Sequence, residues 1–127
     1  MAYNIQPITG GNELGFTSNS TPEVLFAAET NEKTSCWFTL YVVARKISNG
    51  ATKIWQIFGS YKRTTGNLTI SVQSLSLLGT SGDLIEMALA SVSVDNDGSK
   101  FRVTISGLLS NDVQWYGTLT GEEMVEV

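Results

Sequence analysis

The residues that could do chemistry in this chain are carboxylates, because it holds no histidine and only one cysteine, Cys36. A hydrolase without histidine needs two carboxyl groups, one protonated as the acid and one ionised. The acidic residues with suitable spacing are Glu29 with Glu32, Asp83 with Glu86, and the group Glu122, Glu123 and Glu126. None of these groups adjoins an apolar stretch that would form a pocket. We therefore expect solvated side chains and no enzyme activity.

A second candidate is the segment Asp95-Asn96-Asp97-Gly98, which is similar to a fragment of a calcium-binding loop. It lacks the further acidic ligands and the distal bidentate glutamate of a complete loop. A hairpin turn is therefore the better interpretation, and we expect no metal site. The chain also has no phosphate-binding or dinucleotide-binding glycine pattern, so no cofactor is expected. The thiol of Cys36, next to Trp37 and Phe38, is expected to be a small core side chain.

The aromatic residues raise the hypothesis of carbohydrate binding, because sugar rings stack on exposed aromatic faces. The three tryptophans are Trp37, Trp55 and Trp115. They lie within strand-like segments or on an alternating apolar face, so we expect all three in the core. Tyr41, Tyr61 and Tyr116 fall on the less apolar side of their segments and are predicted to contact a partner.

Composition predicts one folded domain that binds neither nucleic acid nor membrane. The chain has 127 residues, 42% of them hydrophobic and 16% charged, against about 25% charged in an average soluble protein. Its net charge of −4 repels phosphate backbones. No segment approaches the ~20 apolar residues of a membrane helix, and no export signal is visible. A single cysteine is compatible with folding in a reducing cytoplasm.

Residues 1–20 are rich in Gly, Asn, Ser and Thr and predict an extended arm. Regular structure is not expected before Thr21-Pro22. The apolar residues of this arm could fasten it to its own domain or to another subunit. They are Tyr3, Ile5, Ile8, Leu14 and Phe16. The alternative is a frayed terminus without a partner.

Residues 21–127 predict a β-sandwich, because short alternating segments are separated by turn residues. After Val72 the apolar parity shifts to Leu75 and Leu77, which predicts a β-bulge. The stretch 84–90 contains good helix formers that Asp83 could cap, but it runs directly into a strand-like segment. We favour a strand over most of residues 85–94. Seven or eight strands result, in an all-β antiparallel β-sandwich or jelly roll.

Several strings in the same order resemble a β-sandwich module of tailed-bacteriophage virion proteins. The strings are Thr21-Pro22-Glu23-Val24-Leu25, Val42-Val43-Ala44-Arg45, Tyr61-Lys62-Arg63-Thr64-Thr65-Gly66, Val103-Thr104-Ile105-Ser106-Gly107, Val113-Gln114-Trp115 and Val125-Glu126-Val127. The resemblance covers residues 21–127 and leaves the arm outside. Residues 84–90 depart from it, since such modules tend to have an aromatic-containing strand there.

The resemblance implies a structural role without enzymatic residues. For a free-standing module it implies a capsid decoration (cement) protein on the capsid exterior of the virion, made in the host cytoplasm. Such a protein is a homotrimer that binds the major capsid protein, with an arm that reaches over neighbouring coat subunits. The alternative is a tail-fibre or tail-associated module that binds a host-surface glycan or protein. That alternative predicts an exposed aromatic patch at one end of the sandwich.

Overall fold

The fold is an all-β sandwich, as the sequence predicts. The computed structural model describes residues 2–8 and 11–126, which form nine strands and one short helix. In chain order these are β1 (Tyr3–Pro7), β2 (Asn12–Thr17), β3 (Glu23–Glu29), β4 (Thr34–Lys46), β5 (Thr52–Arg63), β6 (Thr69–Leu78), α1 (Ser81–Glu86), β7 (Ser91–Asp97), β8 (Lys100–Ser106) and β9 (Val113–Glu126). No helix among the described residues is long and apolar enough to cross a membrane.

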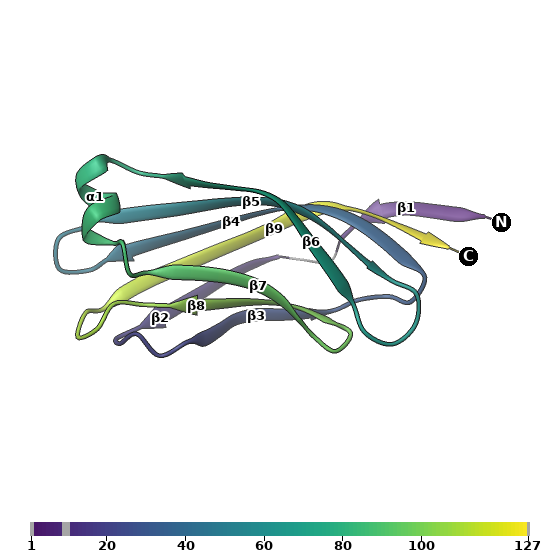
Figure 1. Ribbon diagram of the computed structural model, residues 1–127, viewed down its shortest axis with the longest axis horizontal. Helices are drawn as coiled ribbons and strands as arrows, with labels where there is room; N and C mark the ends of the chain where they lie inside the picture. The colour runs from purple at the N-terminus through teal and green to yellow at the C-terminus, as the bar shows by residue number, and fades with distance from the viewer. Residues whose placement is uncertain (1, 9–10, 127) are drawn as a thin grey trace.

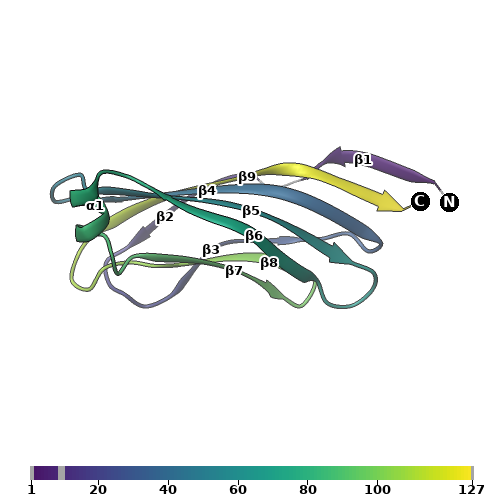
Figure 2. The same cartoon turned by 45° about the horizontal axis from the view of Figure 1, so that its top comes forward.

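The strands form two antiparallel sheets that face each other as two layers (Figures 1 and 2). The large sheet has the order β1-β9-β4-β5-β6, and β2 also pairs with β9. The small sheet has the order β3-β8-β7. Helix α1 lies at one end of the sandwich, and β1 and the end of β9 lie at the other (Figure 1). One side of the large sheet therefore meets the small sheet, and the other side is left open.

The core lies between the two sheets and is built by the period-two alternation of the long strands. In β4, every second residue from Thr34 to Ala44 is buried. Phe38 packs edge-on against Phe101 of the small sheet, with ring centroids 4.9 Å apart. The indoles of Trp55 and Trp115 are stacked at 5.5 Å. Both tryptophans are in the core as predicted.

The expectation that residues 1–20 lack regular structure is wrong. Strand β1 pairs with residues 122–126 and β2 pairs with residues 113–118, both along the same edge of β9. The glycines misled the prediction, because Gly15 lies within β2 as a packing residue. A Cβ atom at Gly15 would lie 2.7 Å from Leu25 Cδ1. These two additional strands bring the number from the expected seven or eight to nine. Whether residues 1–20 act as a separate arm stays a prediction.

The bulge predicted after Val72 is confirmed. Gly59 of β5 is opposite Val72, whereas its neighbour Phe58 is opposite Ser74, so Gln73 is the extra residue. The shift keeps Val72, Leu75 and Leu77 on the same side of the sheet as Ile57 and Trp55, the side that faces the small sheet.

The strand favoured over residues 85–94 is wrong for its first half. Helix α1 begins after Thr80, whose hydroxyl accepts a hydrogen bond from the Asp83 backbone N–H, and β7 begins only at Ser91. The turn after the helix is fixed by tertiary contacts. Met87 is fully buried, and the buried ammonium of Lys53 donates to the carbonyls of Met87 and Ala90 at 3.3 and 3.0 Å. These contacts decide in favour of the helix, which the local sequence left open.

Candidate ligand-binding face

The candidate site is the side of the large sheet that points away from the small sheet, here called the outer face. No other element among the described residues packs over it (Figure 2). It displays exposed aromatic side chains. Trp37 is 48% exposed, Phe58 41%, and Tyr41 and Tyr116 each 39%. An exposed, contiguous set of large rings marks a surface that binds something.

The register places three of these rings in a zigzag along β4 and β5. Phe58 is directly opposite Thr39, the residue between Trp37 and Tyr41 on β4. Phe58 is therefore a diagonal neighbour of both rings, at a spacing of about 7–8 Å, and Trp37 lies about 13 Å from Tyr41 along the strand. We call Trp37, Phe58 and Tyr41 the aromatic row.

The side chains around the aromatic row are small and polar. Ser60 lies opposite Trp37, and Gln56 lies opposite Tyr41 and donates a hydrogen bond to its hydroxyl at 3.2 Å. On β6, Ser74 lies opposite Phe58. The rings thus provide flat apolar surface, and the hydroxyl and amide groups between them provide donors and acceptors.

Two hollows of this face adjoin the exposed rings Trp37 and Tyr116. The first, here called the Trp37 hollow, has a volume of about 440 Å³. It is lined by Ser35, Cys36, Trp37, Ser60, Tyr61, Lys62, Thr69 and Ser71. The second, here called the Tyr116 hollow, has a volume of about 360 Å³. It is lined by Leu14, Gly15, Phe16, Val43, Arg45, Gln114, Trp115 and Tyr116. Each hollow combines an exposed ring with a basic side chain.

The structure brings together some of the residues predicted to contact a partner. Leu14, Phe16 and Tyr116 line the Tyr116 hollow. Tyr41 belongs to the aromatic row, and Tyr3 and Ile5 are exposed on edge strand β1. The remaining two are placed differently. Ile8 packs against the core. Tyr61 is only 6% exposed, and its ring is stacked on Phe38 at 6.3 Å and tilted against Phe101 at 5.8 Å. The prediction that Tyr61 lies on the exposed side is wrong.

Sequence reasoning missed Trp37 and Phe58. Trp37 was expected in the core, and that expectation is wrong. The signal was available in the alternation of β4, where Phe38, Leu40 and Val42 define the buried side and so place Trp37 on the other. The preference of tryptophan for the core outweighed the parity of its position.

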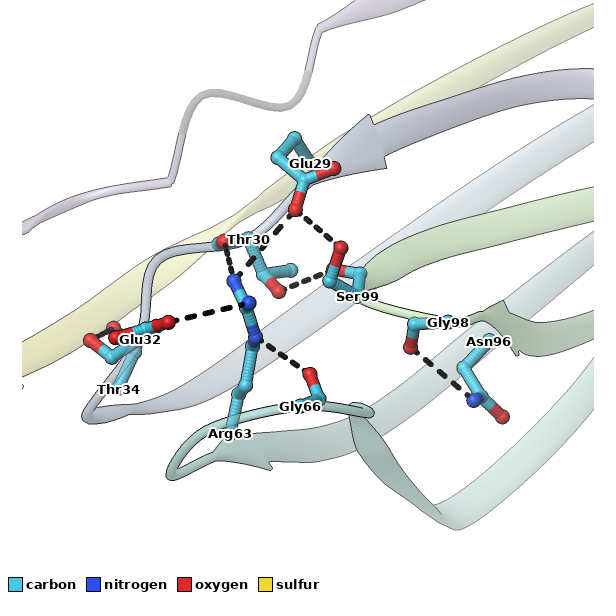
Figure 3. Close-up of polar contacts among 9 residues, drawn as sticks. All are labelled: Glu29, Thr30, Glu32, Thr34, Arg63, Gly66, Asn96, Gly98 and Ser99. Carbon is cyan, nitrogen blue, oxygen red and sulfur yellow. Dashed lines mark hydrogen bonds and ion pairs between the residues drawn. The ribbon is translucent and has the colours of Figure 1, made fainter.

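The carboxylates considered for acid–base chemistry are engaged in structural contacts. Arg63, at the end of β5, donates to the carbonyls of Thr30 and Gly66 at 2.6 and 2.8 Å (Figure 3). Its guanidinium also lies 3.6 Å from Glu29 and 3.8 Å from Glu32. Both carboxylates of this pair therefore bind the same arginine, which connects the loop after β3 with the turn before β6.

The other two acidic groups are likewise separated or occupied. Asp83 accepts a hydrogen bond from the Thr52 N–H, and Glu86 pairs with Lys46 at 3.0 Å, which lowers the pKa of Glu86. Glu123 points into the sandwich, where it accepts hydrogen bonds from Gln6 and Asn31 at 2.6 and 3.1 Å.

Glu122 and Glu126 alternate with Glu123 along β9 and so belong to the outer face. No group of three or more metal-ligating side chains is found among residues 2–8 and 11–126.

The buried thiol of Cys36 is a poor nucleophile. Burial raises its pKa from 9.0 to about 11, although its contact with Tyr61 lowers the pKa in part. The thiolate is the reactive form, so a raised pKa favours the inert thiol at neutral pH. Cys36 is therefore a core residue, as the sequence predicts.

No protein-family model matches the chain, and neither does any curated protein. Among solved structures, it is similar to the tailspike protein of Acinetobacter phage vB_ApiP_P1, with 13% identity over 95% of this chain and a TM-score of 0.44. It is also similar to the tailspike protein of Acinetobacter baumannii phage AM24, with 10% identity over 94% of this chain and a TM-score of 0.39. The chain spans 22% and 26% of the length of these two proteins. At such identities and scores, neither likeness assigns a function to the chain.

Proposed function

We propose that this chain is a non-enzymatic, tail-associated module of a tailed-bacteriophage virion that binds a host-surface glycan through the outer face. The observation that carries the proposal is the aromatic row, three exposed rings on an uncovered sheet surface. The virion assignment is supported by the ordered sequence strings described above. The glycan assignment is supported by the chemistry of the face.

The face suits a glycan because it offers both kinds of contact that a sugar makes. The C–H face of a pyranose ring stacks on a flat aromatic ring, and its hydroxyls need donors and acceptors close by. Trp37 and Phe58 supply exposed rings, while Ser60, Gln56 and Ser74 lie beside them in the same rows. A flat β-sheet surface also holds these groups in place before binding, which limits the entropy lost when the ligand docks.

The second candidate function is capsid decoration, in which the chain binds the major capsid protein as a homotrimer. It is supported by the exposed apolar residues of the N-terminal strands, Tyr3, Ile5, Leu14 and Phe16. The same strands weaken its arm mechanism, because β1 and β2 are paired with β9 of their own sheet and leave little free chain to reach over a neighbour.

The test is binding of the purified chain to host cells, to a polysaccharide panel from the host surface, and to empty phage heads. We expect saturable binding to cells and polysaccharide, weakened about tenfold or more by Trp37→Ala and by Phe58→Ala. Leu89→Ala is the matched control, because Leu89 is an exposed apolar residue in the turn that follows α1, away from the aromatic row. All variants should keep the circular dichroism spectrum of the native chain.

Two results would refute the proposal. One is native-level binding by the folded Trp37→Ala variant. The other is binding to empty heads without any binding to cells or polysaccharide, which would support capsid decoration instead. Weakening of head binding by Phe16→Ala would then locate the capsid contact at the N-terminal strands.

A further inference from the structure

The charge of the outer face narrows the class of sugar that it can bind. The chain has eight lysines and arginines and a net charge of −4. Four of the cationic side chains are already engaged. Lys46 pairs with Glu86, Arg102 with Asp95, Arg63 with Glu29 and Glu32, and the buried Lys53 donates to two carbonyls.

The four other cations are Lys33, Arg45, Lys62 and Lys100, and none of them has an ion-pair partner in the part of the chain that the structure describes. Lys62 is the only charged residue among those that line the Trp37 hollow. A third, smaller hollow of about 180 Å³ shares Ser35 and Lys62 with the Trp37 hollow and is also lined by Lys33. Two of the four unpaired cations, Lys33 and Lys62, therefore line the smaller hollow, and Lys62 also lines the Trp37 hollow.

The register fixes how Lys62 and Trp37 are arranged. Trp37 is opposite Ser60, and Lys62 is two residues further along β5, on the same side of the sheet. The ammonium is therefore a diagonal neighbour of the indole, at a Cα spacing of about 7–8 Å. A sugar ring stacked on Trp37 would place a ring substituent within reach of this flexible lysine. The hydroxyls of Ser60, Thr69 and Ser71 line the remaining wall.

We infer that the ligand of the Trp37 hollow is an acidic sugar, a uronic acid unit whose ring stacks on Trp37 and whose carboxylate binds Lys62. This inference rests on the proposed glycan-binding function. An unpaired ammonium in a hollow lined by hydroxyls attracts an anion, and a carboxylate forms a charge-assisted hydrogen bond with it. Because the charge of Lys62 lies to one side of the indole, it also selects the orientation of the ligand.

The acidic residues near the Trp37 hollow determine the direction in which the carboxylate of the bound sugar points. Glu122 of β9 lies opposite Trp37 on the side away from β5, and Glu126 lines the smaller hollow together with Lys33. A carboxylate on the β9 side of Trp37 would face Glu122 and be repelled. The carboxylate of the sugar therefore points towards β5 and β6, on whose outer face Lys62 is the only charged residue that the structure describes.

The test compares uronic acid polymers with their carboxyl-reduced forms, which keep the ring but lose the charge. We would use polygalacturonate, polymannuronate and hyaluronan, and measure binding of the native chain and of Lys62→Gln by biolayer interferometry. The native chain should bind at least one acidic polymer about tenfold or more tightly than its reduced form. Lys62→Gln should remove this difference, and binding should weaken as salt rises from 50 to 500 mM because the charges are screened.

The matched control is Lys100→Gln, which removes another unpaired lysine that lines neither hollow. It should bind like the native chain. Equal binding of acidic and reduced polymers, or unchanged selectivity in Lys62→Gln, would overturn the acidic-sugar inference and leave the proposed function standing. Absence of binding to either form, together with a negative host polysaccharide panel, would overturn both.

Discussion

The contact between Leu25 of β3 and two glycines of the large sheet permits a quantitative test of how the two sheets pack together. Leu25 of β3 is only 7% exposed and its side chain lies over two glycines of the large sheet. A Cβ atom at Gly15 would lie 2.7 Å from Leu25 Cδ1, and one at Gly117 would lie 2.8 Å from Leu25 Cδ2. The missing Cβ atoms therefore make the space that Leu25 fills.

The effects of substitutions at Leu25 and Gly117 on the free energy of unfolding should therefore be coupled. The effect of Gly117→Ala should change sign when Leu25 is replaced by alanine. Leu25→Ala should lower the free energy of unfolding by about 3 kcal/mol, through lost burial and the cavity left behind. Gly117→Ala alone should lower it by about 1 kcal/mol, because the overpacking against Leu25 costs more than the gain from replacing a strand glycine. In the Leu25→Ala background the obstruction is gone, and Gly117→Ala should raise stability by about 0.5–1 kcal/mol.

The assay is urea unfolding of the native chain, the two single variants and the double variant, followed by circular dichroism. The expected coupling free energy is about 2 kcal/mol. Gly82→Ala is the control, because no atom lies within 4 Å of a Cβ placed at Gly82 of α1, so its effect should add to that of Leu25→Ala. If Gly117→Ala has the same effect in both backgrounds within about 0.5 kcal/mol, Leu25 does not depend on the glycine space and the reasoning is wrong.

Two further predictions concern polar groups that are buried or partly buried. Arg63→Ala should lower the free energy of unfolding by about 2–3 kcal/mol in urea titrations, because the carbonyls of Thr30 and Gly66 lose their donor. Arg102→Ala, which breaks the more exposed ion pair with Asp95, should lower it by less than about 1 kcal/mol when measured in parallel. Equal losses in the two variants would contradict the argument. Raising the pH from about 9 to 11 should lower stability, because the native Cys36 thiol, with its pKa raised to about 11, keeps a proton that the unfolded chain releases near pH 9. The full loss from the thiol is about 3 kcal/mol. Burial also raises the pKa of Tyr61 above 10.0, which adds to the loss from about pH 10 upward, whereas the lowered pKa of Lys53 opposes it below pH 10.5. Cys36→Ala should therefore show a smaller decline than the native chain between pH 9 and 10, where the thiol is the cause.

The sequence predicted the sandwich well because its information is local. Alternation predicted a series of short strands, and turn residues such as Gly50, Gly66 and Gly98, all at positive φ, lie where these strands end. The bulge in β6 followed from a single change of parity.

The errors arose where a distant contact decided the outcome. Residues 84–90 contain the end of α1 and the turn that follows it, because Met87 is buried and Lys53 donates to the carbonyls of Met87 and Ala90. Lys53 lies more than thirty residues away in the sequence. Gly15 indicates a loop when only the local sequence is considered, because the packing of Leu25 against it is a contact with another strand.

The candidate site was predicted only in part, because the type of a residue and its position in the strand alternation gave opposite indications of its burial. Tyr61 was placed with the exposed tyrosines on the basis of its neighbours, although it shares the inner face of β5 with Trp55 and Ile57. Trp37 was assigned by residue type to the core. Whether Lys62 has an ion-pair partner depends on which carboxylates lie close to it in the folded chain. Those distances follow only from the register of the strands, which the sequence does not give.

The pairing of Tyr3 with Glu126 has a practical consequence for any measurement on this protein. The start of β1 and the end of β9 lie side by side at one corner, far from α1 (Figure 1). That corner adjoins the smaller hollow, which Tyr3 and Glu126 help to line. An affinity tag or sensor linkage at either end would crowd this hollow, whereas anchoring through a cysteine introduced in α1 would turn the hollow towards solution. Because β1 and the end of β9 are neighbouring strands, the domain is also suited to insertion into a surface loop of a carrier protein, where the two insertion points would lie about as far apart as two paired strands.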